Sequence, residues 1–241
     1  MTVRAGAARL CRSAERGIRL CPGPELRRNH LMIADSVMRA CSLARETLAA
    51  ATHLDWHVPA GGLEWSCWET IEHMSDDLFV YAAQLGPANP SMSTHVPFGW
   101  HRRREGGPLL TVFVDPTEGP SGLLQVFETC GSMLCAMVNA VPPRRQSFHT
   151  YGISDASGFA AMGVVEVLVH MHDVATGLGL AWSPPADLCQ GALSRLFPGA
   201  PSTGEPWPTL LWATGRMDLP GLPAQVSWTW DGTPATDAAP S

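Results

Sequence analysis

Lysine is absent from this chain, and all sixteen of its basic residues are arginine. Together with 23 glycines and 21 prolines, this usage favours a GC-rich genome of the actinobacterial kind, because the codons of these residues are rich in G and C. The formal net charge is -6, so there is no basic excess. We therefore predict neither a nucleic-acid partner nor a membrane partner.

The sequence also has no CxxC pair and no run of eighteen apolar residues. Its seven cysteines are scattered and odd in number, which argues against a zinc knuckle and against a disulfide framework. The missing apolar run argues against a membrane span, and the basic N-terminus lacks the apolar core of a signal peptide. We expect a cytoplasmic protein with reduced thiols.

Four long segments have apolar residues at helical spacing: residues 31–53, 65–85, 121–141 and 155–179. They predict an all-α protein, an up-down four-helix bundle over residues 30–182. The long Pro- and Gly-rich stretch 87–120 is expected to be a loop, with PLLTVFVDP either a short strand or a segment packed on the core.

The two ends of the chain differ from the bundle in composition and in periodicity. Residues 1–29 are rich in Arg and lack a clear amphipathic repeat, so we expect a disordered N-terminal extension. Residues 183–241 are expected to form a short C-terminal α/β extension packed on the bundle. It would contain two short helices, a strand over the alternating QVSWTW, and a disordered tail.

The stretch VVEVLVHMHD, residues 164–173, places polar side chains in an otherwise apolar helix. At helical spacing, Gly163, Glu166, His170, Asp173 and Gly177 fall on one stripe. A helix that is apolar nearly all round is buried, and an ionised carboxylate buried without a partner is strongly destabilising.

A Glu and a His one helical turn apart form a suitable pair of ligands for zinc, nickel or iron. Such a pair is also common by chance, as a surface pair or as a satisfied structural contact. The apolar surroundings make a solvated surface pair a poor explanation. A third ligand has to come from another helix, and residues 65–85 offer His73. That histidine lies opposite the clearest apolar stripe of its helix, so periodicity alone would place it in solvent.

Two motifs change this interpretation. The pattern W-S-x-W-E-x-I-x-H-M-x-D-D-L in residues 65–78 is followed by G-F-A-A-M-G-V-V-E-V-L-V-H-x-H-D in residues 158–173. Together they resemble the metal-binding domain of the mycothiol-dependent maleylpyruvate isomerase family, within the DinB-like bundle superfamily. The resemblance covers roughly residues 31–182. It implies that His73, Glu166 and His170 bind a divalent metal, with zinc the first expectation.

By the same resemblance, the protein is expected to be a mycothiol-dependent transferase or isomerase. Its partners would be a small thiol and a small electrophile. Asp173 and Asp77 are candidates to hold the metal-bound histidines, because such histidines commonly donate their second N–H to a carboxylate. The isomerases carry a distinct second domain, whereas only residues 183–241 follow the bundle here, so no particular substrate is implied.

Two other functions stay open on the sequence: a non-catalytic metal-binding bundle and a metal-dependent hydrolase. No catalytic residue is assigned. Residues 102–104, all arginine, are expected to be a solvated surface run, and Arg216 to be structural. His149 and Tyr151 could reach the mouth of a pocket, while His172 points away from His170 on the helix and is not expected to be a ligand.

Overall fold

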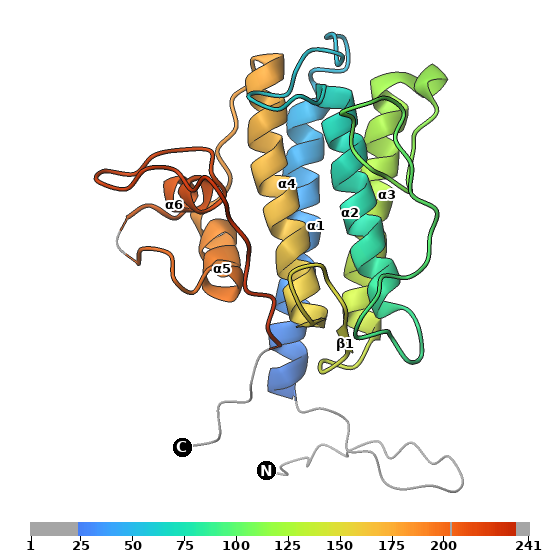
Figure 1. The fold of residues 1–241 in the computed structure, drawn as a ribbon, viewed down its shortest axis with the longest axis vertical. Helices are drawn as coiled ribbons and strands as arrows, with labels where there is room; N and C mark the ends of the chain where they lie inside the picture. Colours follow the sequence, from blue (N-terminus) through green and yellow to red (C-terminus); the bar gives the residue numbers. More distant parts are fainter. Residues whose placement is uncertain (1–23, 203, 235–241) are drawn as a thin grey trace, which may run out of the picture.

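The computed structural model describes residues 24–202 and 204–234. Its long helices are α1 (Pro24–Ala49), α2 (Cys67–Leu85), α3 (Gly119–Ala140) and α4 (Ala156–Leu178), which lie side by side as a bundle (Figure 1). The remaining elements are the 3-10 turn η1 (Pro116–Glu118), the strands β1 (Gln146–Ser147) and β2 (Ser154–Asp155), and the helices α5 (Ala186–Leu196) and α6 (Pro206–Ala213). The prediction of a mostly helical protein is confirmed.

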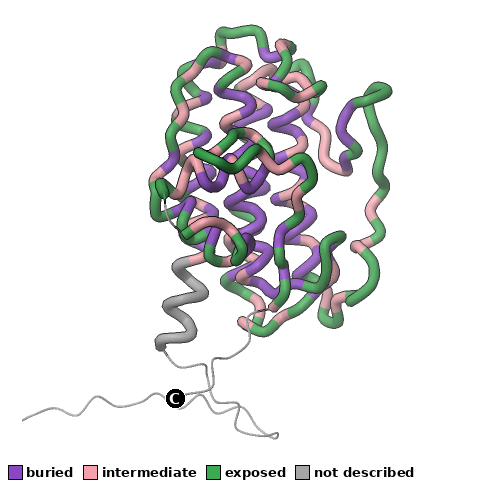
Figure 2. Tube along the Cα trace, turned by 60° about the vertical axis from the view of Figure 1, so that its left-hand side comes forward, coloured by how far each residue is buried: buried purple, intermediate pink, exposed green. Residues whose placement is uncertain are grey.

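Successive helices do not all alternate in direction, as they would in the predicted up-down bundle. In Figure 1, α1 and α4 run upward while α2 and α3 both run downward. Around the bundle, α1 and α2 each contact both α3 and α4. The connection 86–118 carries the chain back along the whole bundle, which a short loop could not do. The buried residues lie mainly where the helices face one another (Figure 2).

The first helix begins earlier than we predicted. Residues 24–29, which the sequence assigned to the N-terminal extension, belong to α1. Proline is tolerated in the first turn of a helix, because a backbone N–H at that position would have no acceptor within the helix. This explains why α1 can begin at Pro24. The rest of the predicted extension lies outside the described residues, as do residues 235–241 of the predicted tail 233–241.

Polar side chains of α2 hold the connection 86–118 against the bundle. The Asp76 Oδ1 accepts from the backbone N–H groups of Thr111 (2.8 Å) and Val112 (2.7 Å). The Glu72 Oε1 accepts from the Val114 N–H (2.9 Å) and from Arg103 (3.0 Å). These bonds satisfy loop amides that would otherwise be buried unpaired. The stretch PLLTVFVDP is therefore a loop anchored on α2, with one isolated β-bridge between His101 and Leu110.

The C-terminal extension packs on one side of the bundle, where α5 contacts α4 and α6 contacts α5 (Figure 1). The predicted strand over QVSWTW was wrong: within 183–202 and 204–234, the only strand-like pairing is a bridge between Leu219 and Leu222. A strand needs a hydrogen-bonding neighbour, and this segment passes helices instead. The alternation still has a structural basis, because Trp228 and Trp230 turn inward while Ser227 and Thr229 stay exposed.

Two helical stretches are long and apolar enough to cross a membrane by length and composition alone: Pro116–Ala140 and Ala156–Leu178. In the more buried of the two, α4, 94% of the most apolar window lies inside the protein. That burial is typical of the core helix of a bundle.

Replacing Asp76 with Ala should release the connection 86–118 from α2. Two buried amides would lose their acceptor, so we expect the free energy of unfolding to fall by roughly 2–4 kcal/mol. Hydrogen exchange at the amides of Thr111 and Val112 should become faster, which is measurable residue by residue. The exposed Asp35→Ala is the matched control on α1 and should change neither quantity. Unchanged exchange in Asp76→Ala would contradict this account of the loop.

Candidate metal centre

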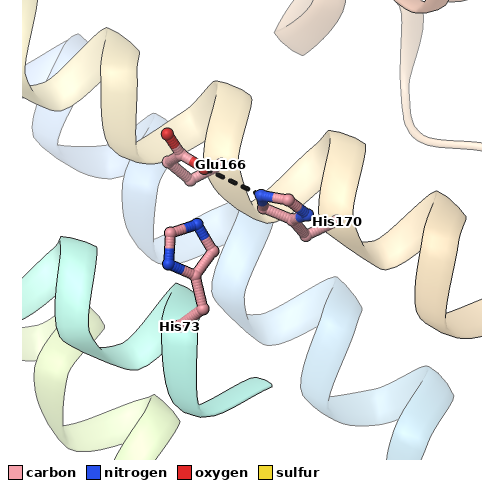
Figure 3. Close-up of side chains that lie close together, drawn as sticks. All are labelled: His73, Glu166 and His170. Atoms are coloured by element: carbon pink, nitrogen blue, oxygen red, sulfur yellow. Dashed lines mark ion pairs between the residues drawn. The ribbon is translucent and has the colours of Figure 1, made fainter. Parts of the chain in front are cut away.

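The start of α2 is fixed by a reciprocal cap, which the Ser-x-x-Glu spacing of Ser66 and Glu69 predicts from the sequence. The Ser66 Oγ accepts from the Glu69 backbone N–H (3.2 Å), and the Glu69 Oε2 accepts from the Ser66 N–H (2.9 Å). This capping box sets the phase of the helix. Two turns later, that phase turns His73 toward α4 (Figure 3).

Helix α4 begins and ends at signals that the sequence predicts, capping residues in SDASGF and C-cap glycines in TGLGL. The Asp155 Oδ1 accepts from the Gly158 N–H (2.8 Å), and Gly179 ends the helix in the left-handed conformation (φ 68°). Within the helix, Gly177 allows a close approach: a Cβ there would lie 2.3 Å from the Pro59 carbonyl oxygen and 2.7 Å from the Cys67 Sγ. At Gly163 a Cβ would lie 2.7 Å from Leu134 Cδ2. The absence of side chains at both ends of the stripe lets α4 sit close to its neighbours.

The three predicted ligands meet between α2 and α4. One ligand atom from each of His73, Glu166 and His170 lies within 4.8 Å of the other two. The His170 Nε2 is 3.2 Å from the Glu166 Oε2, and the two imidazole rings are 5.0 Å apart at nearly a right angle (Figure 3). Two nitrogens and one carboxylate oxygen, converging with space between them, fit a divalent ion of the zinc type.

Periodicity alone was misleading for His73. The side chain is only half-buried, but it faces α4 and packs edge-on against Trp65, with ring centroids 4.8 Å apart. The face of α2 opposite its apolar stripe is not solvated, because Thr70, Glu72 and Asp76 on it are also buried. The motif resemblance, not the helical pattern, led to this residue.

Carboxylates hold both histidines, at the two predicted positions. The Asp173 Oδ2 lies 3.1 Å from the His170 Nδ1, and the Asp77 Oδ2 lies 3.2 Å from the His73 Nε2. The Arg216 Nη2 in turn donates to the Asp173 Oδ2 at 2.9 Å. Such contacts fix the orientation of an imidazole and increase its basicity as a ligand.

A tyrosine that the sequence did not single out holds the glutamate. The Tyr81 hydroxyl donates to the Glu166 Oε1 at 3.3 Å, while the other oxygen of that carboxylate faces His170. Tyr81 follows Asp77 on α2 by one turn, and that spacing is the only signal that could have pointed to it.

The local charges favour the ionisation states that metal ligands need. Burial and the charge of His170 lower the pKa of His73 to about 4, so this imidazole is neutral near pH 7. Burial alone would raise the pKa of Glu166, but the hydrogen bond and charge of His170 outweigh it and lower that pKa. Burial alone would lower the pKa of His170, but Asp173 and Glu166 raise it above its ordinary value. Without a metal, a proton on His170 therefore balances the carboxylates.

A cavity of about 530 Å³ opens onto the cluster, with walls from four parts of the chain, of which the first is the segment 63–65 before α2. The bundle contributes the three ligands, Asp77 and Tyr81, and the β1–β2 connection contributes His149 and Tyr151. The C-terminal extension contributes Arg216, Trp228 and Trp230. No sequence pattern placed the two tryptophans here, and the sequence suggested only a structural role for Arg216.

Two further expectations concern residues outside the cluster. His172 points away from it and packs against Trp207 (ring centroids 5.9 Å apart), as expected. The arginines 102–104 are exposed, but they are not merely solvated. Arg103 bonds Glu72, and Arg104 forms an ion pair with Glu69 (2.7 Å). The run therefore fastens the connection 86–118 to α2.

Comparisons with known proteins do not assign the chain to a family. A scan against protein-family models, a search of curated proteins and a search of solved structures each gave no match to the chain.

Purified protein should contain about one divalent ion per chain, because three ligand atoms converge within 4.8 Å of one another. The variants His73→Ala, Glu166→Ala and His170→Ala should each lose most of it, as measured by elemental analysis. His172→Ala, on the same helix but outside the cluster, should keep full occupancy. If His73→Ala kept full occupancy, His73 would not be a metal ligand, and the proposed three-ligand site would be wrong.

Metal binding should release a proton, because the ion displaces the one favoured on His170. The raised pKa of His170 sets the direction of the pH dependence. As the pH falls through this pKa, a larger fraction of the His170 imidazole is protonated, and the metal affinity drops. His73, with a pKa of about 4, is already neutral and should contribute little near pH 7. Calorimetry in buffers of different ionisation enthalpy measures the proton count. An affinity independent of pH between about 5 and 8 would contradict the assigned ionisation of His170.

Proposed function

We propose that this chain is a DinB-like bundle that binds a divalent metal, zinc being the best fit, through His73, Glu166 and His170. The observation that carries the proposal is the convergence of these ligand atoms within 4.8 Å inside an apolar bundle. A structural ion pair alone would explain Glu166 and His170. It would not explain why the neutral His73 is turned toward them from another helix.

The proposed activity is the use of a low-molecular-weight thiol, mycothiol, for S-transfer to a small electrophile or for its isomerisation. The motif resemblance supports the thiol, and the three-ligand set supports an ion with open positions. When bound, such an ion would lower the pKa of a thiol held against it, so that the thiolate forms near neutral pH. We propose a cytoplasmic setting, where such thiols are kept reduced.

The chain's own residues prepare the site for this chemistry. Tyr81 and Asp173 orient one ligand each, so the donor atoms are held before any ligand arrives. The cavity of about 530 Å³ suits a small molecule, and Trp65, Trp228 and Trp230 give it apolar walls that exclude water. Arg216 is largely occupied by Asp173 and by the Thr214 carbonyl oxygen (2.8 Å).

A metal-dependent hydrolase and a non-catalytic metal-binding bundle are the competing functions. Both share the ligand set, and the response to thiols separates them from the proposal. A hydrolase needs a water at the open position, whereas a thiol-dependent enzyme should prefer sulfur.

Cobalt-substituted protein should develop a thiolate charge-transfer absorption when mycothiol is added. Glutathione and cysteine should give the same band at higher concentration, because the cavity would fit less of each molecule. Absorption titration yields the apparent Kd for each thiol. His73→Ala serves as the control, since it should fail to give the band at matched cobalt concentration. Cobalt loading without any thiol-induced band would rule out the transferase and isomerase and leave the two competing functions.

A further inference from the structure

A second cavity, of about 570 Å³, is formed by the C-terminal extension together with Tyr151 of the β1–β2 connection. We call it the aromatic cavity. It shares Tyr151, Trp228 and Trp230 with the metal-centre cavity, but neither the three candidate metal ligands nor the carboxylates that hold them line it. Its volume is in the range of sites that take small molecules.

A row of four aromatic rings lines the aromatic cavity. The ring centroids of Tyr151 and Trp230 are 5.5 Å apart, those of Trp230 and Trp228 are 5.8 Å apart, and those of Trp228 and Phe197 are 6.3 Å apart. Neighbouring rings are inclined by 72°, 55° and 50°, so they do not cover one another face to face. Tyr151 is 47% exposed and Trp228 is half-buried, so a ligand from solvent can reach both rings. The faces of such rings attract cations.

The charge of the aromatic cavity is negative. Among the described residues that line it, Asp231 is the only charged one, and the other polar side chains, those of Gln225, Ser227 and Thr229, are neutral. Hydrogen bonds from Thr233 hold the pKa of Asp231 below its ordinary value, so this carboxylate is ionised near pH 7. Aromatic faces and one carboxylate in the same wall favour a positively charged ligand.

Two arginines near this wall are already paired with other carboxylates. The Arg216 Cζ is 6.0 Å from the centroid of the Trp228 ring, but this guanidinium binds Asp173 at 2.9 Å. Arg195 binds Asp155 at 3.2 Å. Neither arginine lines the aromatic cavity, so neither fills the place of the ligand.

Hydrogen bonds hold the walls of the aromatic cavity in place. The Asp231 backbone N–H donates to the Leu196 carbonyl oxygen at 2.8 Å, which ties the segment that carries the tryptophans to the end of α5. On the other side of the extension, the Trp212 Nε1 donates to the Pro223 carbonyl oxygen at 2.9 Å. A ligand would therefore meet walls that are already ordered, which lowers the entropic cost of binding.

We infer that the aromatic cavity binds a small molecule with a methylated ammonium group, through the ring faces of Tyr151 and Trp228 and the carboxylate of Asp231. A methylated ammonium suits these walls better than a primary ammonium, which is strongly hydrated and needs several hydrogen-bond acceptors. The inference goes beyond the proposed function, because such a ligand needs neither the metal nor a thiol.

The test compares choline with its uncharged isostere 3,3-dimethyl-1-butanol in ligand-observed NMR titrations of the full chain, whose metal content is measured. The wild type should bind choline with a Kd about tenfold lower than that of the isostere, because only choline gains from the ring faces and the carboxylate. Tyr151→Leu and Asp231→Asn should each raise the Kd of choline about threefold or more, and change that of the isostere by less than about twofold. Tyr151→Phe keeps the ring and is the matched control, which should bind choline as the wild type does.

Glu166→Gln shows which of the two cavities the cation occupies, because it removes a carboxylate from the metal-centre cavity and leaves the aromatic cavity intact. A Kd of choline within about twofold of the wild-type value supports the aromatic cavity. A larger increase would place choline beside the metal ligands and overturn the inference. No binding of choline by the wild type, or equal Kd values for choline and the isostere, would overturn it as well. Failure of the proposed function is read separately, from metal content and from the thiol band of the wild-type protein.

Discussion

A carboxylate buried in an apolar helix is the constraint on which the rest of this structure depends. Glu166 is 8% exposed in the middle of α4, surrounded by valines and leucines of its own helix. Its charge has to be balanced locally, since desolvation without compensation would exceed what a domain of this size can tolerate. His170 provides the first compensation, Tyr81 the second, and Asp173 with Arg216 extends the network to the C-terminal extension. The position of the extension on the bundle is thus linked to the charge in its core.

Helix α2 is the second organising element, because both of its faces are buried. One face packs in the bundle, and the other binds the connection 86–118 through Glu72 and Asp76. That connection in turn lets α3 run parallel to α2. The helix order of the bundle therefore depends on the polar residues of α2 that hold the connection in place. His73 also lies off the apolar stripe, and it is half-buried because it packs against Trp65 and faces His170 on α4.

Local signals were readable from the sequence, and long-range packing was not. The Ser66–Glu69 capping box, the Asp155 cap and Gly179 are short-range interactions that fixed the ends of α2 and α4 correctly. The facing direction of His73 depends on how α2 packs against α4 and Trp65, so the periodicity of one helix could not reveal it. QVSWTW shows the same limit: Trp228 and Trp230 turn inward but Val226 is fully exposed, and a strand also requires a neighbour. For the site, the motifs led to the three candidate ligands, and His149 was considered as a residue at the mouth of a pocket, while the walls formed by Trp228 and Trp230 emerged only from folding.

The close approach of α4 to its neighbours has a consequence for how the site would select an ion. At Gly177 the backbone itself limits the helix separation, and packed leucines do so at Gly163. The spacing of the ligands is therefore set by helix packing, and the site does not fold around an ion as small zinc-dependent domains do. Ions can then exchange on a folded protein. With two imidazoles and one carboxylate, several divalent ions would bind in the order of their intrinsic affinities, so the ion found in the cell would follow its supply. The packing of the helices would fix the geometry of the metal site, and the supply of ions in the cell would determine which metal occupies it.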